Sequence, residues 1–117
     1  MSYELAFWRG GDDLDPSATY LAFSEEREIE GVATVVAADV EAALAHRLSG
    51  WTRSSNILQP PGADPDGAPA FDVFVGRQHV SFTGYGIEEA DHMNAIITVM
   101  HDIGMRLYDP QTDERFG

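Results

Sequence analysis

The 117-residue sequence contains no cysteine and no lysine. Without cysteine there is no disulfide framework, no thiolate metal site and no cysteine nucleophile, as in many proteins of a reducing cytoplasm. No apolar run approaches the roughly 20 residues that a membrane-spanning helix needs. The opening residues MSYELAFWRG lack a basic region and carry Glu4 within their short apolar run, which is not the pattern of a secretory signal peptide. We therefore predict a cytoplasmic protein that does not associate with membranes.

Basic residues are scarce. Seven arginines face 20 Asp and Glu residues, which gives a net charge of −13. Nucleic acid is a poor partner for such a chain, because phosphate contacts need a basic surface. The charge either serves solubility or attracts a cationic protein partner and raises the rate of encounter. The charge alone leaves both interpretations open.

The length and the 44% hydrophobic content indicate a single domain over residues 1–117. Alternating apolar residues predict strands, and apolar residues three or four apart predict amphipathic helices. The predicted strands are 3–9, a short one within 51–58, 71–75, 79–83 and 105–108. The predicted main helices are 36–48 and 88–104. A short early helix is predicted from Pro16 to about Arg27, with Asp15 as its N-cap, and residues 59–69 are predicted to form a loop.

The order strand, helix, strand, strand, helix, strand predicts a ferredoxin-like α/β (α+β) sandwich. Right-handed crossovers would place the two main helices on one face of an antiparallel-containing sheet. The opposite face is then expected to carry Glu4, Trp8, Asp72, Phe74, His79, Arg106 and Tyr108. Aromatic residues on a solvated face indicate a contact surface. Alternatively, the early helix or a second copy of the chain covers them, and a homodimer is one form of this alternative.

The histidines do not form a catalytic or metal-binding pattern. His92 and His101 share a predicted helix, but nine residues at 100° each place them on opposite flanks, where we expect solvated side chains. His46 and His79 are isolated in the sequence. The residues Gly84 and Gly86 resemble part of a phosphate loop, but acidic residues follow where a phosphate would sit. We predict no enzymatic activity, no cofactor and no metal.

Acidic residues are concentrated between positions 12 and 30. This segment contains one basic residue, Arg27, and seven acids: Asp12, Asp13, Asp15, Glu25, Glu26, Glu28 and Glu30. The concentration produces a local negative field as well as a diffuse one. It is either a docking surface for a basic partner or an ordinary charged edge.

Both ends of the chain carry short motifs. The opening matches the form M-S-Y-x-L-x-x-W through Met1, Ser2, Tyr3, Leu5 and Trp8, and the closing residues Tyr108 to Gln111 read Y-D-P-Q, followed by Glu114, Arg115 and Phe116. With the VSFTGYG strand and the amphipathic helix between them, these motifs resemble a group of small acidic bacterial immunity proteins, which are encoded beside polymorphic or contact-delivered toxins.

The resemblance implies a non-catalytic protein that binds a cognate toxin domain, expected to be cationic, and occludes its active site. The residues expected to contact the partner are the seven acids of the segment 12–30 together with Trp8, Phe74 and Tyr108. The alternative function is that of a small ferredoxin-like homo-oligomer with regulatory or housekeeping work and no catalysis.

Overall fold

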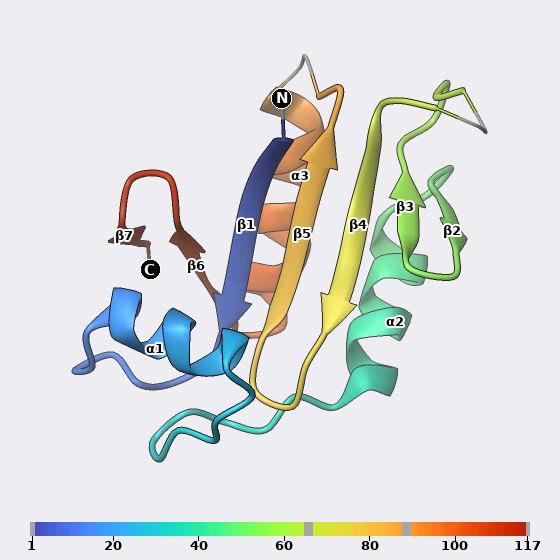
Figure 1. Cartoon of the computed structure of the whole chain (residues 1–117). Coiled ribbons are helices and arrows are strands. Elements are labelled where there is room, and N and C mark those ends of the chain that lie inside the picture. The colour runs from blue at the N-terminus through green and yellow to red at the C-terminus, as the bar shows by residue number, and fades with distance from the viewer. Residues whose placement is uncertain (1, 65–66, 88–89, 117) are drawn as a thin grey trace.

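The computed structural model describes residues 2–64, 67–87 and 90–116, which form one seven-stranded sheet with three helices packed on it (Figure 1). The strand order is β2-β3-β4-β5-β1-β6-β7, and every neighbouring pair is antiparallel. The strands are β1 (Ser2–Trp8), β2 (Thr52–Ser54), β3 (Ile57–Gln59), β4 (Ala70–Val75), β5 (Val80–Tyr85), β6 (Arg106–Asp109) and β7 (Glu114–Arg115). The helices are α1 (Pro16–Ser24), α2 (Ala37–Arg47) and α3 (Ala90–Asp102).

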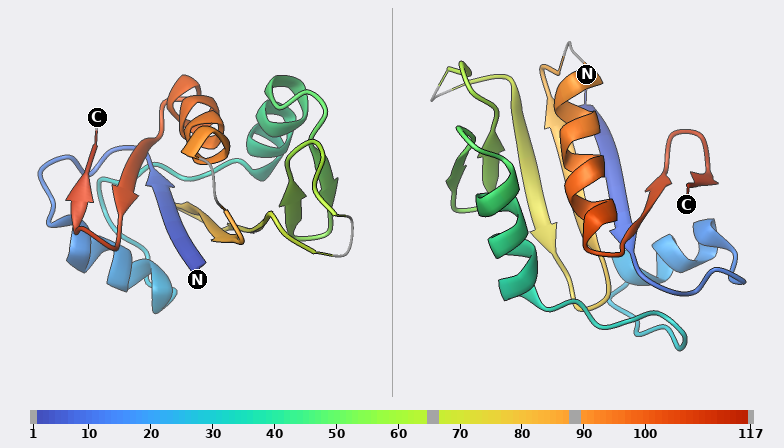
Figure 2. Two further views of the ribbon diagram at one scale, coloured as in Figure 1. Left: turned by 90° about the horizontal axis from the view of Figure 1, so that it is seen from above. Right: turned by 180° about the vertical axis from the view of Figure 1, so that it is seen from behind.

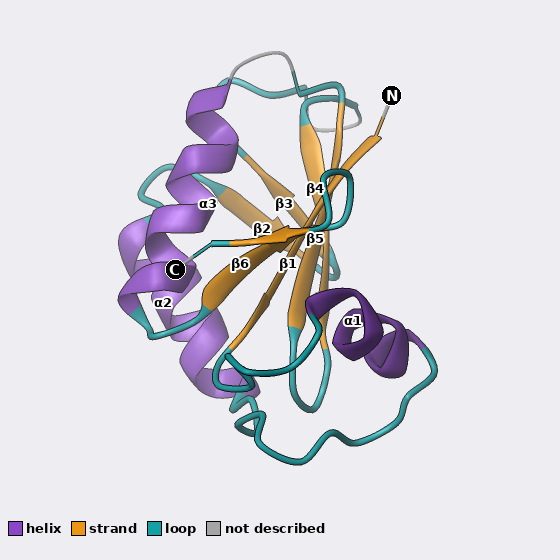
Figure 3. Cartoon of the chain, turned by 90° about the vertical axis from the view of Figure 1, so that its left-hand side faces the viewer, coloured by secondary structure: helices purple, strands orange, loops and turns teal. Residues whose placement is uncertain are grey.

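The three helices lie on both faces of the sheet. Helices α2 and α3 pack side by side against one face, whereas α1 crosses the other (Figures 2 and 3). The chain is therefore a small α+β protein with an antiparallel sheet. This confirms the predicted fold class in its general form. No helix in the described part of the chain is long and apolar enough to cross a membrane.

The larger hydrophobic core lies between the sheet and the helices α2 and α3. Alternate residues of β1, β4 and β5 point into it, as their period of two predicted, and the helices contribute the stripes predicted from their spacing. Its buried members include Leu5, Phe7, Val73, Val80, Phe82, Val40, Leu44, Ile96 and Met100. Val36 was predicted to begin α2, but it is the N-cap of that helix and is 54% exposed.

A second, smaller core lies beneath α1 on the opposite face. It contains Ala6, Trp8, Phe23, Val32 and Tyr108. Trp8 is 0% exposed and Tyr108 3% exposed, so the expectation that they contact a partner on a solvated face is wrong, and the alternative of coverage by the early helix is confirmed. The early helix covers them because Phe23 packs edge-on against Trp8, with 5.3 Å between ring centroids.

Helix α1 ends three residues earlier than predicted. Glu26 adopts a left-handed backbone with φ of 59°, which allows Arg27 N–H to bond Ala22 O at 2.9 Å and Glu26 N–H to bond Phe23 O at 3.0 Å. These two bonds form a Schellman motif, which closes the helix at its C-terminal end. At the other end the predicted cap is confirmed, because the Asp15 side chain accepts a hydrogen bond from Ala18 N–H at 3.1 Å.

Two further differences concern element boundaries. The segment 51–58 forms two short strands, β2 and β3, joined by a turn at Ser55 and Asn56, where one strand was predicted. Strand β7 was not predicted. The predicted start of the last helix at Glu88 and Glu89 lies outside the described residues.

The residues at the two ends of the chain contact one another. Glu4 N–H donates to Gln111 Oε1 at 2.9 Å, and Gln111 Nε2 donates to Glu4 O at 3.0 Å. The Gln111 side-chain amide thus pairs with the backbone of β1 as a neighbouring strand would. Arg115 lies over the Trp8 ring at 4.5 Å and donates to Trp8 O and Gly10 O. The tail therefore closes one edge of the sheet.

Candidate binding groove

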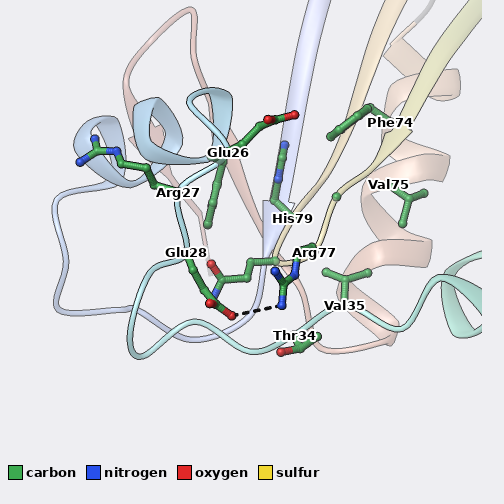
Figure 4. Close-up of a pocket in the computed structure, with 12 residues that line it drawn as sticks. Glu26, Arg27, Glu28, Thr34, Val35, Phe74, Val75, Arg77 and His79 are labelled. Carbon is green, nitrogen blue, oxygen red and sulfur yellow. Dashed lines mark ion pairs between the residues drawn. The ribbon is translucent and has the colours of Figure 1, made fainter.

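A groove with a volume of about 550 Å³ lies between the loop that follows α1 and the turn that joins β4 to β5. This volume is within the range of small-ligand sites. Figure 4 shows the side chains around the groove, which come from three separate stretches of the chain. They are Phe23 and residues 26–28, Thr34 and Val35, and the β4–β5 residues 74–79.

The loop that forms one wall of the groove is held by the buried side chain of Gln78. Gln78 Nε2 donates to Ile29 O at 2.7 Å and to Val32 O at 3.0 Å, and Gln78 Oε1 accepts from Ile29 N–H at 2.7 Å. Val35 N–H adds a hydrogen bond of 2.7 Å to Arg77 O. Because a side-chain amide satisfies three backbone groups of this loop, the loop is fixed to the β4–β5 turn.

Aromatic rings line the groove. The His79 imidazole stacks on Phe23 with 4.8 Å between centroids and an interplanar angle of 3°. It also lies 5.6 Å from the Phe74 ring at an angle of 42°. His79 is 7% exposed, whereas Phe74 is 56% exposed. Burial lowers the pKa of His79, which favours the neutral imidazole.

Two of the acidic residues at the rim of the groove form ion pairs, and a third does not. Glu25 forms an ion pair of 2.7 Å with Arg27, and Glu28 forms one of 3.6 Å with Arg77. The Arg27 side chain points away from the groove, whereas the Glu26 carboxylate extends toward the end where His79 and Phe74 lie (Figure 4). Within residues 2–64, 67–87 and 90–116, Glu26 has neither an ion pair nor a hydrogen bond to its carboxylate. The rim therefore carries an uncompensated negative charge.

The structure divides the predicted acidic segment between the two ends of α1. Glu26 and Glu28 line the groove, and Glu25 and Glu30 are exposed beside it. Phe74, which was also predicted to contact a partner, lies in the same groove.

The other predicted contact residues lie elsewhere. Asp15 caps the start of α1, and Asp12 is paired with Arg106 and, at 3.6 Å, with Arg115. Asp13 is exposed in the same turn. Trp8 and Tyr108 are buried beneath α1, so they offer no side chain to a partner in this structure.

Sequence reasoning missed the groove itself. It placed Phe74 and His79 on the same sheet face, which is correct, but it interpreted His79 as an isolated histidine, either at the surface or partly satisfied. The loop that encloses them is set by Gln78, and nothing in the local sequence relates Gln78 to residues 29–32. The signal that was available is the alternation of β5, which places His79 beside Phe74 rather than in the main core.

The other histidines of the described chain do not line the groove. No three His, Asp or Glu side chains in the described part of the chain lie close enough to hold a metal ion. His101 is exposed as expected. His92, which was expected to be solvated, is half-buried with its ring 5.8 Å from Trp51, and its Nδ1 is buried without a hydrogen-bond partner. The helix is turned so that this flank faces the loop that contains Trp51.

No protein family matches this chain, and no curated protein sequence shows significant similarity to it.

Proposed function

We propose that this protein is a non-catalytic immunity protein that binds a cationic toxin domain and occludes its active site. The observation that carries the proposal is the position of the exposed acids 25–30 beside the groove, in a chain with a net charge of −13. A negative surface attracts a basic partner from a distance, and an aromatic groove gives that partner a place to bury an anchor. The resemblance of the two chain ends to immunity proteins points to the same class of partner.

The proposed contact surface differs from the one that the sequence suggested. Phe74 remains the aromatic contact residue, and the acids that contribute are Glu25, Glu26, Glu28 and Glu30. Trp8 and Tyr108 support this surface from beneath α1. The proposal places the protein in the cytoplasm, where a toxin that has entered the cell acts.

We also propose that the fold is ferredoxin-like. The elements β1, α2, β4, β5, α3 and β6 have the sheet order β4-β5-β1-β6, which is the order of a ferredoxin-like βαββαβ unit. We assign α1, the β2–β3 hairpin and β7 as additions to that unit. The addition of α1 creates the groove, because its C-terminal end and the following loop form one wall.

The test is co-expression with the product of the adjacent gene, followed by measurement of the association and dissociation rates of the purified complex. The informative variant carries Glu26→Lys and Glu30→Lys, because neither carboxylate has an ion-pair partner among the described residues. The matched control carries Asp13→Lys and Glu114→Lys, which changes the net charge equally at the far end of α1. We expect the first variant to associate at least tenfold more slowly than the control.

Salt supplies a second measurement on the same complex. Screening by salt should slow the association of the wild-type protein and change its dissociation much less. The absence of a complex with any neighbouring gene product would defeat the functional proposal. Equal association rates for the two variants would remove the electrostatic mechanism.

The alternative is a homo-oligomer that pairs through the open half of the sheet. Phe74 and Tyr85 are 56% and 46% exposed on that face, which gives the alternative its specific support. Sedimentation velocity over a hundredfold range of concentration distinguishes the two functions, because the immunity proposal does not require a second copy of the chain.

A further inference from the structure

We propose that the groove receives an arginine side chain of the cationic partner, with the guanidinium held between the Glu26 carboxylate, the His79 imidazole and the Phe74 ring. The identity of the partner depends on the proposed function. The ligand chemistry of the groove depends only on the residues that line it.

His79 supplies an unused hydrogen-bond acceptor. Its side chain is more than nine-tenths buried and lines the groove. Among the described residues no protein group forms a hydrogen bond with its imidazole. A neutral imidazole has one nitrogen that accepts and one that donates. Because no described protein group bonds this imidazole, its accepting nitrogen can take a hydrogen bond from a guanidinium N–H in the groove.

Phe74 supplies an aromatic surface that is open to a ligand. Its ring is exposed on the sheet face at the mouth of the groove, although β4 places neighbouring Val73 and Val75 toward the main core. Guanidinium groups stack on aromatic faces and are attracted by the negative potential of the ring. Phe74 therefore favours a planar cation over an anion or a simple hydroxyl compound.

Glu26 supplies the negative charge that attracts the guanidinium. Its left-handed backbone, φ 59°, is unfavourable for a residue with a side chain, and it directs the carboxylate over the groove (Figure 4). The two arginines nearby do not compete for it, because Arg27 pairs with Glu25 and Arg77 pairs with Glu28. A carboxylate and an arginine form charge-assisted hydrogen bonds, which are stronger than those between neutral groups.

The experiment is an NMR titration of the isolated protein with the peptide acetyl-Gly-Arg-Gly-amide. The matched ligand is acetyl-Gly-citrulline-Gly-amide, which has nearly the same shape without the charge. We expect the arginine peptide to shift the resonances of Glu26, Phe74 and His79 and to bind at least tenfold more tightly than the citrulline peptide. A lysine peptide should bind more weakly than the arginine peptide, because an ammonium group does not stack on Phe74.

The variants Glu26→Gln and Phe74→Ala should each weaken arginine binding at least threefold, whereas Asp13→Asn should leave it unchanged. Equal binding of the arginine and citrulline peptides would overturn the proposal. So would shifts spread evenly over all acidic residues, or a concentration-dependent dimer that buries Phe74.

The result separates this inference from the proposed function. A complex with the neighbouring gene product that forms equally well with Phe74→Ala and Glu26→Gln would retain immunity and reject the groove as the arginine site. Specific binding of the arginine peptide without any such complex would retain the site and reject immunity.

Discussion

Tyr3 Oη donates a hydrogen bond of 2.7 Å to Asp109 Oδ2, which joins two residues that are 106 positions apart in the sequence. The bond connects the motif at the start of the chain to the motif at its end. Asp109 is 6% exposed, and it also accepts from Gln111 N–H at 2.9 Å. The end motifs therefore form a clamp, by which we mean the hydrogen bonds that hold β1 and β6 together. This clamp lies at a distance from the groove where we propose that the partner binds.

Removing the Tyr3 hydroxyl with Tyr3→Phe should lower the free energy of unfolding by about 1–2 kcal/mol, because a buried carboxylate loses one of its donors. Urea denaturation monitored by fluorescence measures the change. The control is Tyr85→Phe at an exposed site, which should stay within about 0.5 kcal/mol of the wild type. Equal stability of Tyr3→Phe and the wild type would show that the clamp contributes nothing.

The effect of Tyr3→Phe on stability should depend on pH. Burial acts to raise the pKa of Asp109, but the hydrogen bonds from Tyr3 and Gln111 outweigh it and hold the pKa below its ordinary value. A carboxyl group with a lowered pKa stabilises the fold at pH values above its unfolded-state pKa, and this contribution is lost as the pH falls through the folded-state pKa. The stability difference between Tyr3→Phe and the wild type should therefore be largest near pH 7 and shrink below about pH 4.

Trp8→Ala should destabilise the fold by about 3–5 kcal/mol, which is the usual cost of deleting a buried aromatic side chain. Trp8 packs against Phe23 and Tyr108 and lies beneath the Arg115 guanidinium. Thermal unfolding followed by circular dichroism measures the loss, and the milder variant Trp8→Phe keeps the experiment informative if the alanine variant does not fold. Unchanged stability with weakened partner binding would instead restore Trp8 as an exposed contact residue.

Glu26→Gly should raise the free energy of unfolding by about 0.5–1 kcal/mol. Glycine adopts the left-handed conformation at this position without the steric cost that a side chain incurs, and part of that gain is offset by the greater freedom of glycine in the unfolded chain. The control is Glu25→Gly, where φ is −92° and glycine brings no such gain. Under our proposal the stabilised Glu26→Gly variant binds the arginine peptide more weakly, so stability and binding change in opposite directions.

The buried His79 should make stability depend on pH just below the unfolded-state pKa of about 6.5. Burial lowers the pKa of His79 in the folded state, so the unfolded chain takes up the proton first as the pH falls. Stability is therefore complete above the unfolded-state pKa and decreases below it, by at most about 1.4 kcal/mol per pH unit. The variant His79→Phe preserves stacking on Phe23 and should flatten this dependence, whereas His101→Asn at an exposed site should not. Urea midpoints at several pH values measure both.

Local patterns were sufficient to predict most of the secondary structure. The alternation in β1, β4 and β5 assigned each side chain to a face, and Leu5, Phe7, Val73 and Phe82 are buried as predicted. The apolar spacing of α3 and the Asp15 cap of α1 were likewise readable, because both depend on residues close together in the sequence.

Long-range pairings could not be read in this way. Alternation placed Trp8 and Tyr108 on the correct sheet face, but whether that face is open depends on where α1 packs, and α1 is short and weakly patterned. The closure of the groove by Gln78 and of the sheet edge by Gln111 joins residues 46 to 107 positions apart. The sequence around a glutamine does not indicate which distant backbone group its side chain will bond.

The interior position of β1 in the sheet has a consequence for biosynthesis. Its two partners are β5 and β6, so this strand leaves the ribosome well before either of them exists. At about 5–20 residues per second, roughly 4–16 s pass before β5 has been made. During this interval β1 presents apolar side chains on both faces, and Glu4 is the one charge within its length. We expect Glu4 to act as a gatekeeper that limits association of nascent chains through this strand.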